Sequence, residues 1–150
     1  MANFINNYPQ KIINDSIFFH QMELYVEAQH HRGRPYIGEY LDEKNGSWLM
    51  GDRERSRYYN HSTFNDLIIT GIVGLRPRID NTLEVNPLIP ADKWNWFCLD
   101  NVWYHGHNLT ILWDKDGGRY HLGKGLRVLV DGKEVGHSDI LSRLLCENVL

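Results

Sequence analysis

The chain has 150 residues, a formal net charge of −3 and an isoelectric point near 6.2. This length fits one domain, or two small units that share a core, and it allows an apolar core without disulfides or metals. No block of basic residues is present, which argues against a protein that binds nucleic acid through its phosphates. No apolar run approaches a membrane span, and the first ten residues lack the basic-then-apolar layout of a signal peptide. The chain as given is therefore expected in the cytoplasm, or as a piece of something longer.

Aromatic residues are the unusual part of the composition: five Trp, eight Tyr and five Phe. On loops, Trp and Tyr side chains could stack on sugar rings or bases, whereas in a β-rich protein they fill the core. Composition alone favours the core. Cys98 and Cys146 both lie in apolar stretches, which favours buried free thiols over a disulfide.

The first third of the chain is predicted to be helical. Residues 9–30 carry apolar side chains mostly three, four and seven positions apart, which is typical of an amphipathic helix. Pro9 suits its first turn, and Gly33 and Pro35 end it. Residues 32–61 are then long and irregular. Such loops tend to be functional or disordered, and the Tyr and Trp content of this one argues against disorder.

A second helix is predicted over residues 62–74, with Ser62 as its N-cap. It is apolar on nearly all sides, so we expect it to be buried. Gly71 indicates a tight helix contact, and Gly74 closes the helix. Two long helices are too few to bury the second one, unless a sheet covers it or helical partners are missing.

From about residue 77 the pattern changes to short alternating strands with turn signals. Hairpins are predicted around HGHN, through Asp116-Gly117 and through Asp131-Gly132. The tail after Ser138 is either a short helix capped by that residue or a last strand. The predicted fold class is α+β: a helical segment over residues 1–76 with two long helices, then an antiparallel sheet or half-sandwich over residues 77–150.

The loop at residues 36–48, YIGEYLDEKNGSW, is the main candidate for chemistry. It combines the carboxylates Glu39, Asp42 and Glu43 with aromatic neighbours. Glycosidic hydrolysis needs one carboxyl group as acid and another as base or nucleophile, and aromatic side chains could form a sugar platform. The alternative is an ordinary solvated acidic loop. Glu39 is the most embedded of the three, whereas Asp42 and Glu43 are typical of the shoulder of a turn.

His61 lies just before the second predicted helix. There it could hydrogen-bond a substrate hydroxyl, or it could serve as a capping and packing residue. The other histidines are scattered, and no metal-binding spacing, phosphate cradle or nucleophile elbow is found in the sequence. No cofactor and no metal are therefore predicted.

Four stretches carry a family resemblance: GRPYIGEYLDEKNGSW, YYNHSTFNDLIITGIVGLRPR, NTLEVNPLIP and YHGHNLTILWDKDG. Over about residues 9–135 the chain resembles the C-terminal portion of glycoside hydrolases with an (α/α)6 six-hairpin toroid, of the mannosylglycerate-hydrolase-like and processing-glucosidase-like kind. In such enzymes a β-sheet module follows the last toroid helices, and a loop carboxylate near those helices is the catalytic base. The resemblance implies this role for Glu39. The family's general acid lies upstream, in toroid helices that these residues do not contain.

The leading hypothesis is thus the C-terminal region of a glycoside hydrolase that acts on poly- or oligosaccharide and is inactive alone. A periplasmic or secreted parent enzyme is compatible with it. The partner would be carbohydrate, with neither nucleic acid nor membrane. The residues expected to bind the sugar are Tyr36, Tyr40, Trp48, Tyr59 and His61.

Two rival hypotheses remain. The sheet could be a non-catalytic carbohydrate-binding module that uses Trp94, Trp96, Trp103 and Trp113, or the chain could be a complete enzyme by itself. Because a helical fragment would lack the helices that cover it, self-association is also predicted through an apolar patch at Ile13, Ile17 and Leu24.

Overall fold

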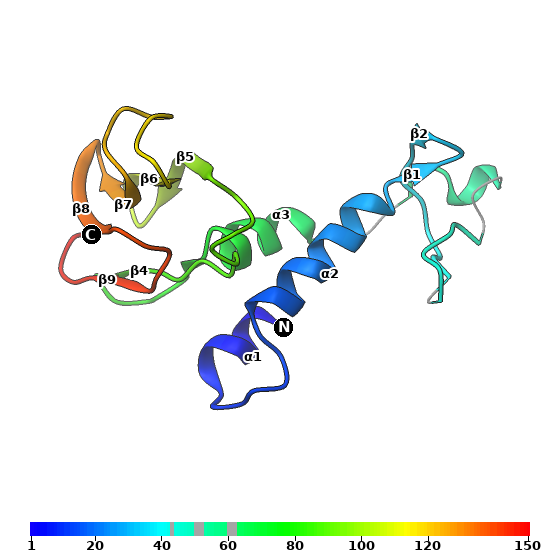
Figure 1. Ribbon diagram of the computed structural model, residues 1–150, viewed down its shortest axis with the longest axis horizontal. Helices are drawn as coiled ribbons and strands as arrows, with labels where there is room; N and C mark the ends of the chain where they lie inside the picture. The colour runs from blue at the N-terminus through cyan, green and yellow to red at the C-terminus, as the bar shows by residue number, and fades with distance from the viewer. Residues whose placement is uncertain (43, 50–52, 60–62) are drawn as a thin grey trace.

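The computed structural model describes residues 1–42, 44–49, 53–59 and 63–150. A β module lies at one end of the elongated molecule and a small loop lobe, comprising the described residues of 28–59, lies at the other, with helices between them (Figure 1). The helices are α1 (Ala2–Asn7), α2 (Asp15–Glu27) and α3 (Phe64–Leu67), the last continued by a π-helical turn, η2 (Ile68–Ile72). The loop lobe holds β1 (His30–His31), β2 (Arg34–Pro35) and a 3-10 turn, η1 (Glu54–Ser56). The β module holds β3 (Leu75–Arg76), β4 (Leu83–Val85), β5 (Trp96–Tyr104), β6 (His107–Asp114), β7 (Gly125–Val130), β8 (Lys133–Ser138) and β9 (Leu144–Cys146).

The first long helix, α2, is shorter than the predicted span of residues 9–30. Its 13 residues begin after Asn14, whose side chain accepts the backbone N–H of Ile17 at 3.0 Å. Upstream, the Gln10 side chain accepts the backbone N–H groups of Ile12 and Ile13, both at 2.8 Å. These local side-chain bonds compete with helix formation before Asn14. At the other end the prediction is also wrong, because β1 follows α2 almost at once.

The second predicted helix is not long. It consists of four α-helical residues and five π-helical residues, and it ends at Gly74, which has φ +85°. The predicted Ser62 cap lies outside the described residues, and Thr63 stands at the N-cap position. A Cβ added to Gly71 would lie 2.3 Å from Cζ of Phe18, so the predicted tight contact is confirmed. Full burial is wrong: within α3 and η2 only Gly71 and Ile72 are buried.

Two antiparallel sheets, β5-β6-β7-β8 and β3-β4-β9, build the β module. The predicted antiparallel sheet is therefore confirmed. The hairpin at Asp131-Gly132 has φ +50° and +78° at its two turn residues, the left-handed pair that a two-residue type I′ turn requires. The tail forms a last strand, because β9 pairs with β4, with Leu83 opposite Cys146.

The connection from β6 to β7 is a longer loop than the predicted tight hairpin, and Asp114 organises it. This buried carboxylate accepts the backbone N–H groups of Gly117, Arg119 and Tyr120 at 2.8–2.9 Å. Burial alone would raise the pKa of Asp114, but these backbone donors together hold it below its ordinary value.

The core lies between the two sheets and the middle of α2. Its fully buried side chains are Leu83, Val85, Leu109, Ile111, Leu126 and Val128, each with 0% exposure. Phe18 and Phe19 of α2 join this cluster at 2% and 3% exposure. Of the two cysteines, which are both free thiols, Cys146 is buried as predicted and Cys98 is exposed. Among the described helices, none is both long and apolar enough to cross a bilayer.

Candidate functional site

The loop lobe begins with the β1–β2 hairpin at the C-terminal end of α2. Its turn residues Arg32 and Gly33 have φ +51° and +72°. Tyr36 then donates its backbone N–H to the Gln29 carbonyl oxygen at 2.9 Å, which ties the following loop back to the end of the helix. The backbone of the candidate loop, residues 36–48, is therefore held against the C-terminal end of α2 where the loop begins.

Glu39 lies between two isolated bridges of this loop. Gly38 pairs with Arg57, and Leu41 pairs with Trp48, so the backbone is anchored on both sides of Glu39. The side chain is partly buried. Among the described residues, Glu39 has no hydrogen bond or ion pair. The carboxylate of Glu39 is thus left without a hydrogen-bond donor or a cation from the described residues.

Tyr36 and Trp48 form a small internal core of the loop lobe. Each is 9% exposed, and their rings pack edge to face at a centroid distance of 5.1 Å. The Trp48 indole N–H donates to the His30 carbonyl oxygen at 2.9 Å, and the His31 ring lies 5.3 Å from that of Tyr36. Burial of this degree leaves little of either ring for contact with a sugar.

Of the described residues predicted to bind the sugar, Tyr40 and Tyr59 are the more accessible, at 60% and 46% exposure. Tyr40 has φ +64°, a left-handed conformation that is uncommon for a residue other than glycine. Its carbonyl oxygen accepts the backbone N–H of Leu49 at 3.0 Å. His61, predicted to bind substrate, lies outside the described residues, as does Glu43.

Asp42 is a turn residue, as the sequence predicts. Its carboxylate accepts the backbone N–H of Lys44 at 2.8 Å, and its carbonyl oxygen accepts that of Gly46 at 2.8 Å. These hydrogen bonds stabilise the turn that follows Glu39, so the role of Asp42 is structural.

The tryptophans of the β module do not form one continuous surface. Trp113 is buried at 4% exposure and donates its indole N–H to the Trp94 carbonyl oxygen at 3.0 Å. The strand register places Trp96 and Trp103 on the opposite face of the sheet, where they are 49% and 75% exposed. The Arg119 guanidinium lies 4.3 Å from the Trp96 ring centroid and covers part of it. This cation–π contact was not foreseen from the sequence, because it depends on the fold of the loop around Asp114.

No group of three or more His, Cys, Asp or Glu side chains that could hold a metal ion occurs in the described part of the chain. His107 contacts Asp131 at 2.7 Å across the hairpin end. This hydrogen bond is the main cause that lowers the pKa of Asp131. This contact joins the start of β6 to the turn between β7 and β8.

Comparison with known proteins relates this chain to a family model and to a solved structure. Residues 75–137 match the model of the glycosyl hydrolase family 65, C-terminal domain. A solved structure named "Sialidase" is 76% identical, with a TM-score of 0.95. That match covers 100% of this chain and 14% of the other, so the chain spans about one seventh of that protein. These findings agree with the resemblance drawn from the sequence: the chain is similar to the C-terminal portion of a glycoside hydrolase, and its β module to the C-terminal domain of glycosyl hydrolase family 65.

Proposed function

We propose that this chain is the C-terminal region of a glycoside hydrolase that acts on poly- or oligosaccharide, and that it supplies a general base to a site completed by other parts of the enzyme. The observation that carries the proposal is the 76% identity over the whole chain to 14% of a longer protein. The match of residues 75–137 to a glycosidase-associated domain supports it independently. On this proposal the chain alone has no glycosidase activity, and the six-hairpin toroid belongs to the rest of the enzyme.

The general base is Glu39. A general base needs a carboxylate with a free oxygen and a fixed position, because proton transfer is sensitive to geometry. The two bridges beside Glu39 and its lack of a partner in the described residues support this role. The carboxylate would accept a proton from the water that attacks the anomeric carbon, or would itself attack it, while a second carboxyl group protonates the leaving oxygen.

The aromatic residues of the loop lobe divide into two roles. Tyr40 and Tyr59 are exposed enough to contact a sugar ring. Tyr36 and Trp48 are buried against each other, and we assign them to holding the loop and so positioning Glu39. His61 is proposed to donate or accept a hydrogen bond with a substrate hydroxyl.

The test uses a chimera in which this chain replaces the matching 14% of the sialidase-named relative. Glu39→Gln removes the proton acceptor and keeps the shape of the side chain. We expect turnover to fall by about 10²–10⁴-fold, the usual contribution of a general base. The matched control is Glu54→Gln, an exposed carboxylate in η1 of the same lobe. If Glu39→Gln and Glu54→Gln turn over at the same rate as the parent, Glu39 is not the base.

A second candidate function is non-catalytic carbohydrate binding by the β module. It is favoured by the exposure of Trp96 and Trp103 on one face of the sheet. Polar groups flank Trp103: the Asn108 amide donates to the Asn101 side chain at 2.8 Å. Titration of the isolated chain with oligosaccharides, followed by Trp fluorescence, would show saturable binding that Trp103→Ala removes. Unchanged fluorescence at millimolar sugar would exclude it.

A further inference from the structure

A turn runs from Asp42 to Ser47 in the candidate loop, and two backbone hydrogen bonds close it. Asp42 donates its N–H to the Ser47 carbonyl oxygen, and Gly46 donates its N–H to the Asp42 carbonyl oxygen, both at 2.8 Å. Gly46 has φ +69°, a left-handed conformation that suits glycine. Asn45, Gly46 and Ser47 are all exposed. The turn thus presents the dipeptide Asn45-Gly46 to water.

The side chain of Asn45 folds over the backbone that follows it. Its Oδ1 accepts the backbone N–H of Ser47 at 2.8 Å, which is the hydrogen bond of an Asx turn. This bond keeps Cγ of Asn45 beside the nitrogen of Gly46, because both atoms lie in the small ring that the bond closes. It also polarises the side-chain carbonyl, since the N–H points at the oxygen on which negative charge develops when Cγ is attacked. The arrangement therefore favours attack by the Gly46 nitrogen on Cγ of Asn45.

Gly46 leaves its nitrogen accessible for this reaction, and one hydrogen bond opposes it. A Cβ at Gly46 would meet nothing within 4 Å, so a succinimide ring between Asn45 and Gly46 fits without a clash. The bond from the Gly46 N–H to the Asp42 carbonyl oxygen must open before the nitrogen can attack. Exposed turns open locally at a small cost in free energy, so opening of this turn sets the rate of the reaction.

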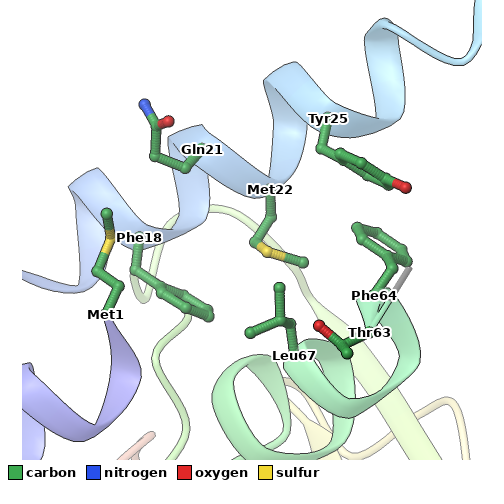
Figure 2. A pocket seen from close by; sticks show the side chains of 8 residues that line it. All are labelled: Met1, Phe18, Gln21, Met22, Tyr25, Thr63, Phe64 and Leu67. Carbon is green, nitrogen blue, oxygen red and sulfur yellow. The ribbon is translucent and has the colours of Figure 1, made fainter. Parts of the chain in front are cut away.

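Other side-chain amides lack this combination. No other Asn in the sequence is followed by glycine. Asn148 is exposed and has φ +56°, but the β-branched Val149 follows it and crowds the next nitrogen. Gln21 lies beside the groove between α2 and α3, where the backbone N–H that follows it belongs to the hydrogen-bond ladder of α2 (Figure 2). Asn45 is therefore the side-chain amide that this reaction should select.

We propose that Asn45-Gly46 is a site of spontaneous modification that loosens the candidate loop. The Gly46 nitrogen attacks Cγ of Asn45, a new N–Cγ bond replaces the Cγ–Nδ2 bond, and the side-chain nitrogen leaves as ammonia with the proton from Gly46. Water then opens the succinimide at either carbonyl and gives aspartate or isoaspartate at this position. Either product adds one negative charge, which takes the formal net charge from −3 to −4. The inference does not depend on the proposed function.

Isoaspartate changes the turn more than aspartate does. Its main chain runs through the former side chain and gains one atom before the nitrogen of Gly46. The two backbone hydrogen bonds that close the turn cannot both keep their geometry across the longer path. Trp48 follows the turn directly and packs against Tyr36. Isoaspartate therefore weakens the support of the loop that carries Glu39.

The experiment incubates the isolated chain at neutral pH and follows each Asn by peptide mapping with mass spectrometry. We expect Asn45 to convert while Asn148 remains an amide. Asp42→Ala removes the side-chain acceptor of the Lys44 N–H, a bond of 2.8 Å, and should speed conversion of Asn45 about fivefold, the equilibrium effect of losing one hydrogen bond. The matched control, Glu54→Ala, changes an exposed carboxylate of the same lobe and should leave the rate unchanged. Conversion of Asn148 as fast as Asn45, or equal rates in the two variants, would overturn the proposal.

The loosening is measured on the isoaspartate form, which ion exchange separates from the parent by its added charge. Just beyond the turn, the Leu49 N–H donates to the Tyr40 carbonyl oxygen at 3.0 Å. We expect hydrogen exchange at Leu49 to be about fivefold faster or more in the isoaspartate form. Asn45→Gln, whose longer side chain closes a ring less readily, should remain a single charge species. Equal exchange at Leu49 in the two forms, or the same acidic form arising in Asn45→Gln, would contradict the assignment.

Discussion

Gly74 joins the π-helical turn to β3, and replacing it with alanine tests two structural demands at once. Its φ of +85° costs an L-residue about 1–2 kcal/mol. An added Cβ would also lie 2.2 Å from the carbonyl carbon and oxygen of Asn86 and 2.4 Å from the nitrogen of Pro87. Backbone atoms cannot move aside as a side chain does, so overpacking adds about 1–3 kcal/mol. The expected destabilisation is therefore about 2–5 kcal/mol, or a fall in Tm of about 5–15 °C.

Gly132 supplies the matched control. It has φ +78°, but a Cβ there would meet nothing within 4 Å. Gly132→Ala should therefore cost only the conformational part, about 1–2 kcal/mol. Urea unfolding followed by both circular dichroism and Trp fluorescence gives the two free energies, with unchanged m-values as the check that both variants unfold in the same way. If Gly74→Ala is no more destabilising than Gly132→Ala, the clash with the Asn86 backbone is not real.

Two further predictions concern charge and surface. Backbone donors lower the pKa of Asp114 in the folded state. The ionised carboxylate therefore stabilises the fold fully above the unfolded pKa of about 3.9. This stabilisation is lost as the pH falls through the lower pKa of the folded state. Urea melts from pH 7 to pH 3 should show a loss of stability in acid that is smaller in Asp114→Asn, and parallel curves would refute the linkage. The isolated chain is predicted to self-associate through Ile17 and Leu24, which are 39% and 44% exposed on α2, with Ile13 beside them. Light scattering should report a mass above 17.6 kDa that Leu24→Glu reduces, whereas a concentration-independent monomer would rule this out.

The β module could be predicted from the sequence because its signals are local. Alternating side chains and the Asp131-Gly132 pair specify a hairpin within about a dozen residues. The helix boundaries could not be predicted, because they depend on competition between side chains and backbone. Gln10 and Asn14 redirect the backbone N–H groups that the predicted helix would have used. The π-helical turn likewise packs against Phe18, more than fifty positions earlier in the chain.

The paired backbone on both sides of Glu39 agrees with the predicted ordered loop, whereas the catalytic and binding roles of its residues stay predictions. The position of Glu39 in an ordered loop follows from glycine spacing and aromatic content. The burial of Tyr36 and Trp48 does not follow, since the same residues could face a ligand or each other. Only the edge-to-face contact between them decides this. The loop around Asp114 could not be predicted from the sequence either, because a carboxylate that accepts backbone N–H groups has no fixed sequence spacing from them.

The pairing of β9 with β4 has a consequence for how the chain is made. Leu83 lies opposite Cys146, and β4 is the central strand of its three-stranded sheet. During synthesis one edge of β4 therefore stays unpaired until residues 144–146 have left the ribosome. An open strand edge beside the apolar side chains of Leu83 and Val85 is a template for pairing with another chain. Pairing of β9 with β4 closes this edge, so the small sheet is completed only after every strand of the larger four-stranded sheet has been made.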